Sequence, residues 1–150
     1  MIRPDSWTAT FDRATVPVDA VRDANRVGAG RSVCWMRVNS DLGDPSDAAS
    51  QLIHRCWLAY LSDDMPTESV VRAHPEGAAL QEADALFCAS LDHTIWFHRP
   101  LRADRWHLYD FTCHHYVGAR GLSIGHVFAA DGLHVATVAQ EVLVRDSRGH

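Results

Sequence analysis

The clearest pattern in the chain is a repeat of apolar residues at helical spacing between Pro45 and Asp64. Apolar positions three and four residues apart form one broad stripe, which is typical of a helix that buries one face. Ser46 and Asp47 favour the N-cap position, and Pro45 suits the turn before it. The pattern therefore predicts one long helix over residues 45–64, buried through Ala49, Leu52, Ile53, Cys56, Trp57 and Tyr60.

The remaining apolar segments have the pattern of β-strands. Pro17 restricts the first of them to a sheet edge, and Gly118 or Gly121 is expected to interrupt the fourth. Asp131-Gly132 predicts a two-residue hairpin turn with a positive φ at both positions. We expect strands at residues 15–21, 32–38, 86–97, 106–129 and 135–144.

The segments between these elements are interpreted as loops. Residues 26–31 and 39–44 are short and rich in glycine or polar residues. Residues 65–84 lack a sustained period and contain Pro66, Pro75 and Gly77, so they are expected to form a long loop with at most one helical turn. A loop of that length in a compact domain usually binds a ligand or a partner.

These elements predict an α+β fold in which a curved antiparallel sheet of about five strands wraps around one long helix, a hotdog-like arrangement. The 150 residues suffice for one such domain but hardly for two, and residues 1–30 contribute little to the pattern. One curved sheet with one helix leaves an edge strand and part of a face uncovered. We therefore expect a homodimer or higher homo-oligomer, or pairing with a separate hotdog protein.

Composition excludes several functional classes. A net charge of −5 and the lack of a basic cluster with interleaved aromatic residues argue against a nucleic-acid surface. No window approaches 18 consecutive apolar residues and the N-terminus lacks a leader pattern, so no membrane association and a cytoplasmic location are expected. The four cysteines show no metal or disulfide spacing and are interpreted as free thiols, and no metal site is expected.

Polar residues interrupt several of the predicted elements. Asp63 lies at the end of the predicted helix, Ser90 and Asp92 interrupt the strand at 86–97, and Gln140 interrupts the last strand. A buried carboxylate or amide without a partner costs several kcal/mol. We therefore expect these side chains to bond to one another, to water or to a ligand.

Several strings in the sequence resemble the bacterial type II acyl-CoA thioesterases. Residues 91–100, LDHTIWFHRP, resemble the "DHSxWFHRPF" string of that family, and residues 59–63, AYLSD, resemble its "AYxSD" helix end. Ala119-Arg120-Gly121, Asp131-Gly132 and the VAQE string at residues 138–141 follow in the family's order and at similar spacing. The resemblance runs from about residue 35 to residue 145 and implies the C-terminal hotdog half of a double-hotdog chain.

The resemblance also implies an activity and its residues. Members of this family hydrolyse fatty acyl-CoA thioesters without a covalent intermediate and without a cofactor, through a water held by an Asp, a Ser or Thr and a Gln. Carried over, these are Asp63, Ser90 and Gln140, with an acyl-CoA or acyl-carrier thioester as substrate. The adjacent Asp64 is a rival for the carboxylate role. Asp92 and His93 are interpreted as structural, bonded to each other or to Arg99.

The chain departs from the family at three points. It has room for one hotdog domain rather than two, and Val142 replaces the glycine that follows the family's "QE". The third departure is a bulky run, His114, His115 and Tyr116, in the place of a strand of small residues. We expect these three side chains to contact the substrate, with at least one histidine pointing inward. A metal pair of Cys113 and His115 lacks a third ligand.

Two alternatives to hydrolysis remain. One is a catalytically degenerate hotdog subunit that binds acyl thioesters or completes a partner's site, which the single-domain length and the bulky run favour. The other is an enoyl-thioester hydratase or dehydratase, for which Asp110 and His115 have a suitable spacing within a predicted strand.

Overall fold

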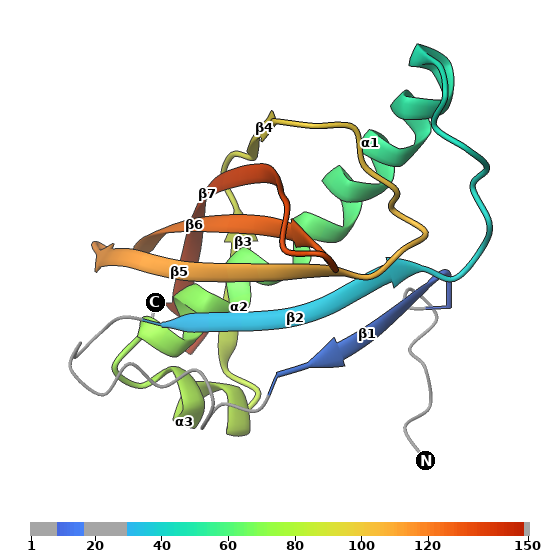
Figure 1. Ribbon diagram of the computed structural model, residues 1–150. Helices are drawn as coiled ribbons and strands as arrows, with labels where there is room; N and C mark the ends of the chain where they lie inside the picture. The colour runs from blue at the N-terminus through green and yellow to red at the C-terminus, as the bar shows by residue number, and fades with distance from the viewer. Residues whose placement is uncertain (1–8, 17–29, 149–150) are drawn as a thin grey trace.

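A computed structural model describes residues 9–16 and 30–148 and shows an α+β fold built on a single antiparallel sheet (Figure 1). The strand order is β1-β2-β5-β6-β7-β3, and β4 also pairs with β7. The predicted sheet and helix are confirmed, although the described residues form seven strands rather than about five. The elements are β1 (Phe11–Thr15), β2 (Arg31–Val38), α1 (Ala48–Ser62), α2 (Asp64–Ala73), α3 (Gly77–Glu82), β3 (Leu86–Ser90), β4 (Thr94–Phe97), β5 (His107–Val117), β6 (Arg120–Ala129) and β7 (His134–Asp146).

The predicted loop at residues 65–84 is wrong, because α2 follows α1 after a single residue, Asp63, and α3 follows α2. Pro66 is the third residue of α2, where a helix does not need the backbone N–H that proline lacks. The same proline cannot donate to the carbonyl group of Ser62, so the helical hydrogen-bond ladder is interrupted beside Asp63. The two prolines and the glycine therefore mark boundaries between helices.

The sheet wraps around α2 and not around the helix predicted at residues 45–64, so this part of the prediction is wrong. Helix α2 contacts β2, β5, β6 and β7, whereas α1 extends beyond the sheet (Figure 1). Val70 of α2 is fully buried and packs so closely on β6 that a Cβ atom at Gly121 would lie 2.4 Å from its Cγ1 atom. Glycine at position 121 therefore allows the close approach of α2 to the sheet.

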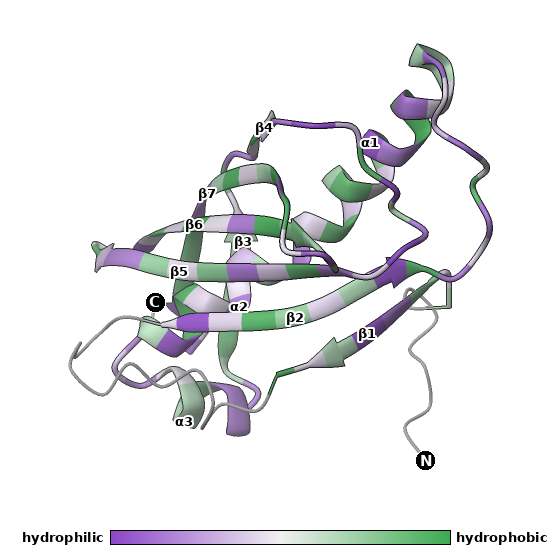
Figure 2. Ribbon diagram, viewed as in Figure 1, coloured by the Kyte–Doolittle hydropathy of each residue, from purple (hydrophilic) through white to green (hydrophobic). Residues whose placement is uncertain are grey.

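The expected buried face of α1 is also wrong. Leu52, Ile53 and Tyr60 are 60%, 49% and 50% exposed, and Ala49 and Cys56 are exposed too. Only Trp57 of the predicted set packs partly against the core. Figure 2 shows hydrophobic residues along the part of α1 that stands clear of the sheet. The apolar stripe of α1, residues 49, 52, 53, 56 and 60, thus faces away from the core of its own domain.

Two buried polar side chains explain this orientation of α1. Gln51 accepts a hydrogen bond from the backbone N–H of Leu101 and donates one to its carbonyl oxygen, both at 3.3 Å. His54 accepts from the N–H of Ala103 at 3.1 Å and donates through Nε2 to the carbonyl of Gly43 at 3.3 Å. These bonds satisfy backbone groups of the segment before β5 and the carbonyl of Gly43 before α1, which apolar side chains could not do.

The predicted strand at residues 86–97 is divided into β3 and β4. Both pair with β7, but the register shifts between Ser90, opposite Val142, and Thr94, opposite Ala139. In the gap, Leu91 donates its N–H to the carbonyl of Glu141 at 2.9 Å, and the Asp92 carboxylate accepts the N–H of Glu141 at 2.8 Å. A side chain replaces a backbone acceptor here, so the strand is interrupted.

The two hairpins lie close to the expected positions. β5 and β6 are joined through Gly118 and Ala119, which have φ values of 60° and 63°. Between β6 and β7, Gly132 has a positive φ but Asp131 does not, so the predicted turn with two positive φ values is wrong there. The N-terminal edge strand spans Phe11–Thr15, and most of the predicted strand at 15–21 and loop at 26–31 lies outside the described residues.

Candidate active site

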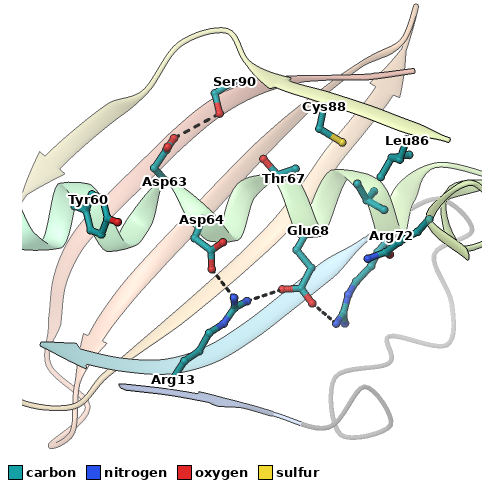
Figure 3. A pocket seen from close by; sticks show the side chains of 12 residues that line it. Arg13, Tyr60, Asp63, Asp64, Thr67, Glu68, Arg72, Leu86, Cys88 and Ser90 are labelled. Carbon is teal, nitrogen blue, oxygen red and sulfur yellow. Dashed lines mark hydrogen bonds and ion pairs between the residues drawn. The ribbon is translucent and has the colours of Figure 1, made fainter. Parts of the chain in front are cut away.

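Three polar residues from separate elements meet at the junction of α1 and α2. Asp63 is the junction residue, Ser90 ends β3, and Gln140 lies in β7. The amide nitrogen Nε2 of Gln140 donates to Oδ1 of Asp63 at 3.0 Å and also to Oγ of Ser90. The Ser90 hydroxyl lies 3.5 Å from the same carboxylate oxygen. Figure 3 marks this contact with a dashed line. The structure thus brings the three residues of the predicted water site together.

The three residues differ in their access to solvent. Gln140 is fully buried because it occupies an inward position of β7 between Val138 and Val142. The Asp63 side chain is 58% exposed. Among the described residues, the side-chain hydrogen bonds to Asp63 all fall on Oδ1. The carboxylate therefore has one oxygen held by the protein, and the amide lies behind it.

A fourth residue, His93, completes the cluster. Its Nδ1 atom lies 2.7 Å from Oε1 of Gln140 and its Nε2 atom 3.1 Å from the Ser62 hydroxyl. The expected bonds of His93 to Asp92 or Arg99 are wrong, because Asp92 binds the backbone of β7 and Arg99 donates to the carbonyl of His134. The sequence offers no pattern that distinguishes these partners, since the break between β3 and β4 decides where His93 points.

A cavity of about 730 Å³ opens beside Asp63 (Figure 3). Leu86, Cys88 and Ser90 alternate along β3 and form one wall. The other lining residues come mainly from the helices and from β1. They are Arg13, Tyr60, Asp63, Asp64, Thr67, Glu68, Val71, Arg72 and Gln81. Asp63 and Ser90 therefore face the cavity, whereas Gln140 is not among its lining residues.

The charged side of the cavity is an ion-pair network. Arg13 lies 2.7 Å from Asp64 and 3.2 Å from Glu68, and Glu68 also pairs with Arg72 (Figure 3). Burial raises the pKa of Asp64, and Arg13 opposes that shift. Asp64, the rival carboxylate, is thus engaged with Arg13, while Asp63 bonds to the neutral Gln140 and Ser90.

The bulky run at residues 114–116 lies away from this cavity. His114 and His115 are both exposed, so the expectation that one histidine points inward is wrong. A β-bulge between Cys113 and His115 interrupts the alternation on which it depended. Tyr116 donates its hydroxyl to the carbonyl of Val144 at 2.8 Å, and its ring centroid lies 4.9 Å from that of His74.

Other candidate groups have partners of their own. Asp110 forms a bidentate pair with Arg31 at 2.8 and 2.6 Å, so the carboxylate proposed for a hydratase is held at the sheet surface. Cys34, Cys56, Cys88 and Cys113 are free thiols. Within residues 9–16 and 30–148, no group of three or more His, Cys, Asp or Glu could hold a metal ion. Over the same ranges no helix is long and apolar enough to span a membrane.

Comparison with known proteins places this geometry in context. The sequence model of the acyl-CoA thioesterase C-terminal domain matches residues 3–144. Acyl-CoA thioesterase 2 of Haemophilus influenzae is 37% identical over 113 residues, which cover 75% of this chain and 37% of that protein. Acyl-coenzyme A thioesterase 8 of Mus musculus is 33% identical, covering 77% of this chain and 33% of that protein. The chain thus spans about a third of the length of these curated relatives.

Solved structures show the same fold. An acyl-CoA thioesterase II from Mycobacterium marinum superposes with a TM-score of 0.78 at 34% identity, covering 98% of this chain and 53% of that one. A protein of unknown function with a hotdog fold from Alicyclobacillus acidocaldarius gives a TM-score of 0.63 at 19% identity, covering 97% of this chain and 50% of that one. The predicted hotdog fold is confirmed. Since the family model matches nearly the whole chain, this protein belongs to the acyl-CoA thioesterase C-terminal domain family.

Proposed function

We propose that this chain hydrolyses acyl-CoA or acyl-carrier thioesters with a water molecule bound at Asp63 and Ser90. The observation that carries the proposal is the hydrogen-bonded set of Asp63, Ser90 and Gln140 at the edge of the cavity. The named relatives, which are acyl-CoA thioesterases, support the substrate class.

The contacts suggest a division of labour within the set. Asp63 Oδ1 is held by Gln140, so the second carboxylate oxygen, Oδ2, is the one that would accept a proton from water. Ser90 faces the cavity, and its hydroxyl would orient that water toward the thioester carbonyl. Gln140 uses its amide hydrogens on Asp63 and Ser90, so it holds both groups rather than the water itself.

We also propose that the working unit contains a second copy of this chain. The apolar stripe of α1 is exposed, although its residues are the kind that proteins bury. The chain matches 53% of the solved Mycobacterium marinum thioesterase, which has room for a second domain of this size. A second copy would supply the corresponding cover for the stripe.

The experiment that tests the activity measures free thiol release from short, medium and long acyl-CoAs by the purified chain and by Asp63→Asn. The variant keeps the shape and the contact with Gln140 but cannot accept a proton. We expect turnover to fall on the order of 10²-fold or more. Unchanged turnover in Asp63→Asn would remove this carboxylate from the mechanism.

Asp64→Asn is the matched control, because it removes one charge from the neighbouring residue. Its carboxylate pairs with Arg13, so its replacement should lower stability more than turnover. A loss of turnover confined to Asp64→Asn would transfer the role of base to Asp64. A folded dimer that binds acyl-CoA without cleaving it would favour the binding subunit instead.

A further inference from the structure

We propose that His93 is a positioning residue that sets the direction of the Gln140 amide and thereby holds Asp63 and Ser90 in place. The inference rests on the proposed function for its kinetic consequence but not for its geometry. His93 is not among the residues that line the cavity, and its Nδ1 atom lies 3.9 Å from Oδ1 of Asp63. It therefore acts through Gln140 and not on the substrate.

The hydrogen positions follow from what each group can donate. An ionised carboxylate only accepts, so the Gln140 atom that contacts Asp63 is the amide nitrogen Nε2. The amide oxygen Oε1 then faces His93 and can only accept. Nδ1 of His93 must therefore carry a hydrogen.

The opposite arrangement of the Gln140 amide would fit His93 and also Ser90, whose hydroxyl can donate to an amide oxygen, but it would not fit Asp63. If the Gln140 amide rotated by half a turn, its nitrogen would donate to an unprotonated Nδ1, but its oxygen would face the Asp63 carboxylate. Two acceptor oxygens, Oε1 of Gln140 and Oδ1 of Asp63, would then face each other with no hydrogen between them, which is unfavourable for the fully buried Gln140 amide. The tautomer of His93 and the direction of Gln140 are thus coupled.

Ser62 allows Nδ1 to keep its hydrogen in both charge states of His93. The Ser62 hydroxyl lies 3.1 Å from Nε2 of His93 and 3.1 Å from the carbonyl oxygen of Ala59. With a neutral imidazole, the hydroxyl donates to Nε2. With an imidazolium, Nε2–H donates to the hydroxyl oxygen, which turns its hydrogen to Ala59. The contact with Gln140 is the same in both cases.

The kinetic test compares His93→Leu with His93→Asn in thioester hydrolysis. Leucine removes the donor, whereas asparagine places an N–H close to the former position of Nδ1. We expect His93→Leu to lower kcat about 10²-fold with little change in KM, since a misplaced catalytic group costs about that much. His93→Asn should restore kcat to within a few-fold of the unmodified chain. Equal losses in both variants would contradict the proposal.

A double-mutant cycle separates positioning from a general structural role. In a Gln140→Ala background His93 has no amide to orient, so His93→Leu should change kcat less than about 2-fold. Ser62→Ala is the matched control, because it removes the partner of Nε2 and leaves the Nδ1 contact in place. If the fold-loss of kcat in the double variant equals the product of the losses in His93→Leu and Gln140→Ala, the inference is overturned.

A third measurement needs no activity. Long-range ¹H–¹⁵N NMR of the full chain identifies which imidazole nitrogen of His93 carries the hydrogen at neutral pH. We expect the hydrogen on Nδ1, or on both nitrogens. A hydrogen on Nε2 alone would refute the inference, whether or not the chain hydrolyses any thioester. Absence of hydrolysis together with the Nδ1–H form would count against the proposed function and not against the positioning contact.

Discussion

His107, at the start of β5, is a titratable side chain buried away from the cavity. It is 3% exposed, and its Nδ1 atom donates to the carbonyl of Arg105 at 2.8 Å. Burial lowers the pKa of His107 below its ordinary value of 6.5, because the charged form is poorly solvated there. The folded protein therefore resists a protonation that the unfolded chain accepts.

The lower pKa of His107 in the folded chain than in the unfolded chain predicts a stability that depends on pH. Below pH 6.5 the unfolded chain binds a proton at His107 before the folded chain does, so the free energy of unfolding falls as the pH falls. The slope is at most about 1.4 kcal/mol per pH unit and ends once the pH is below the folded-state pKa. Urea unfolding between pH 8 and pH 5 measures it. His107→Asn keeps an N–H donor without titrating and should show a shallower decline; identical curves would exclude His107 as the cause.

The sequence alone could identify some of the residues of the site. Asp63, Ser90 and Gln140 were expected from strings that resemble a family, and the structure places them within hydrogen-bonding distance. The contact of His93 with Gln140 could not be predicted, because it depends on a one-residue register shift between β3 and β4. Ser90 and Asp92 interrupt the apolar segment, but the sequence does not show which residue of β7 lies opposite Thr94 after the break.

Among the elements, the hairpin between β5 and β6 has an unusual residue in its turn. Ala119 has a φ of 63°, a conformation that costs an L-residue with a Cβ atom roughly 1 kcal/mol or more. Gly118 also has a positive φ, and the pair fits the turn type that prefers Asn-Gly and Gly-Gly sequences. The turn is therefore formed at the expense of some backbone strain.

Replacing this alanine should stabilise the protein. We expect Ala119→Asn to raise the free energy of unfolding by about 0.5–1 kcal/mol, because asparagine tolerates a positive φ better than alanine does. Chemical denaturation of the variant checks this. Ala130→Asn is the control, since Ala130 is exposed in the next hairpin without a positive φ. An equal gain at both positions would point to a cause other than turn strain.

Two predictions about the helices were wrong: the loop at residues 65–84 and the buried face of α1. Residues 65–84 were expected to be a loop because prolines and a glycine usually interrupt helices. Here Pro66 lies in the first turn of α2, where the helix does not use the backbone N–H that proline lacks. The stripe of α1 was correctly recognised as apolar, but spacing does not say what covers a face. Gln51 and His54 face the protein because backbone groups there need partners.

For the whole molecule, the exposed stripe of α1 predicts an oligomer that surface charge can disrupt. Leu52→Glu with Ile53→Glu introduces charges where a second copy would pack, but these side chains are 60% and 49% exposed in the single chain. We therefore expect loss of self-association with little change in the stability of the isolated fold. Sedimentation over a range of concentrations measures the association.

A control variant separates this effect from a general change in surface polarity. Leu133→Glu alters another apolar residue that is 51% exposed, in the hairpin between β6 and β7. Self-association should persist in this variant. A double variant of α1 that associates as strongly as the unmodified chain would place the interface elsewhere, and a chain that is monomeric throughout would require a different protein partner.

The strand order determines when the site can form during synthesis and folding of the chain. Asp63 and Gln140 are 77 residues apart in sequence, and β7, the last of the described strands, is flanked in the sheet by β6 and β3. Helices α1 and α2 can form from local contacts, but long-range strand pairing is slower because distant chain segments must first meet. During synthesis from the N-terminus, Asp63 and Ser90 emerge long before the amide that joins them. The three-residue site therefore cannot form in a chain that stops before β7, and its assembly depends on the pairing of β7 with β6 and β3.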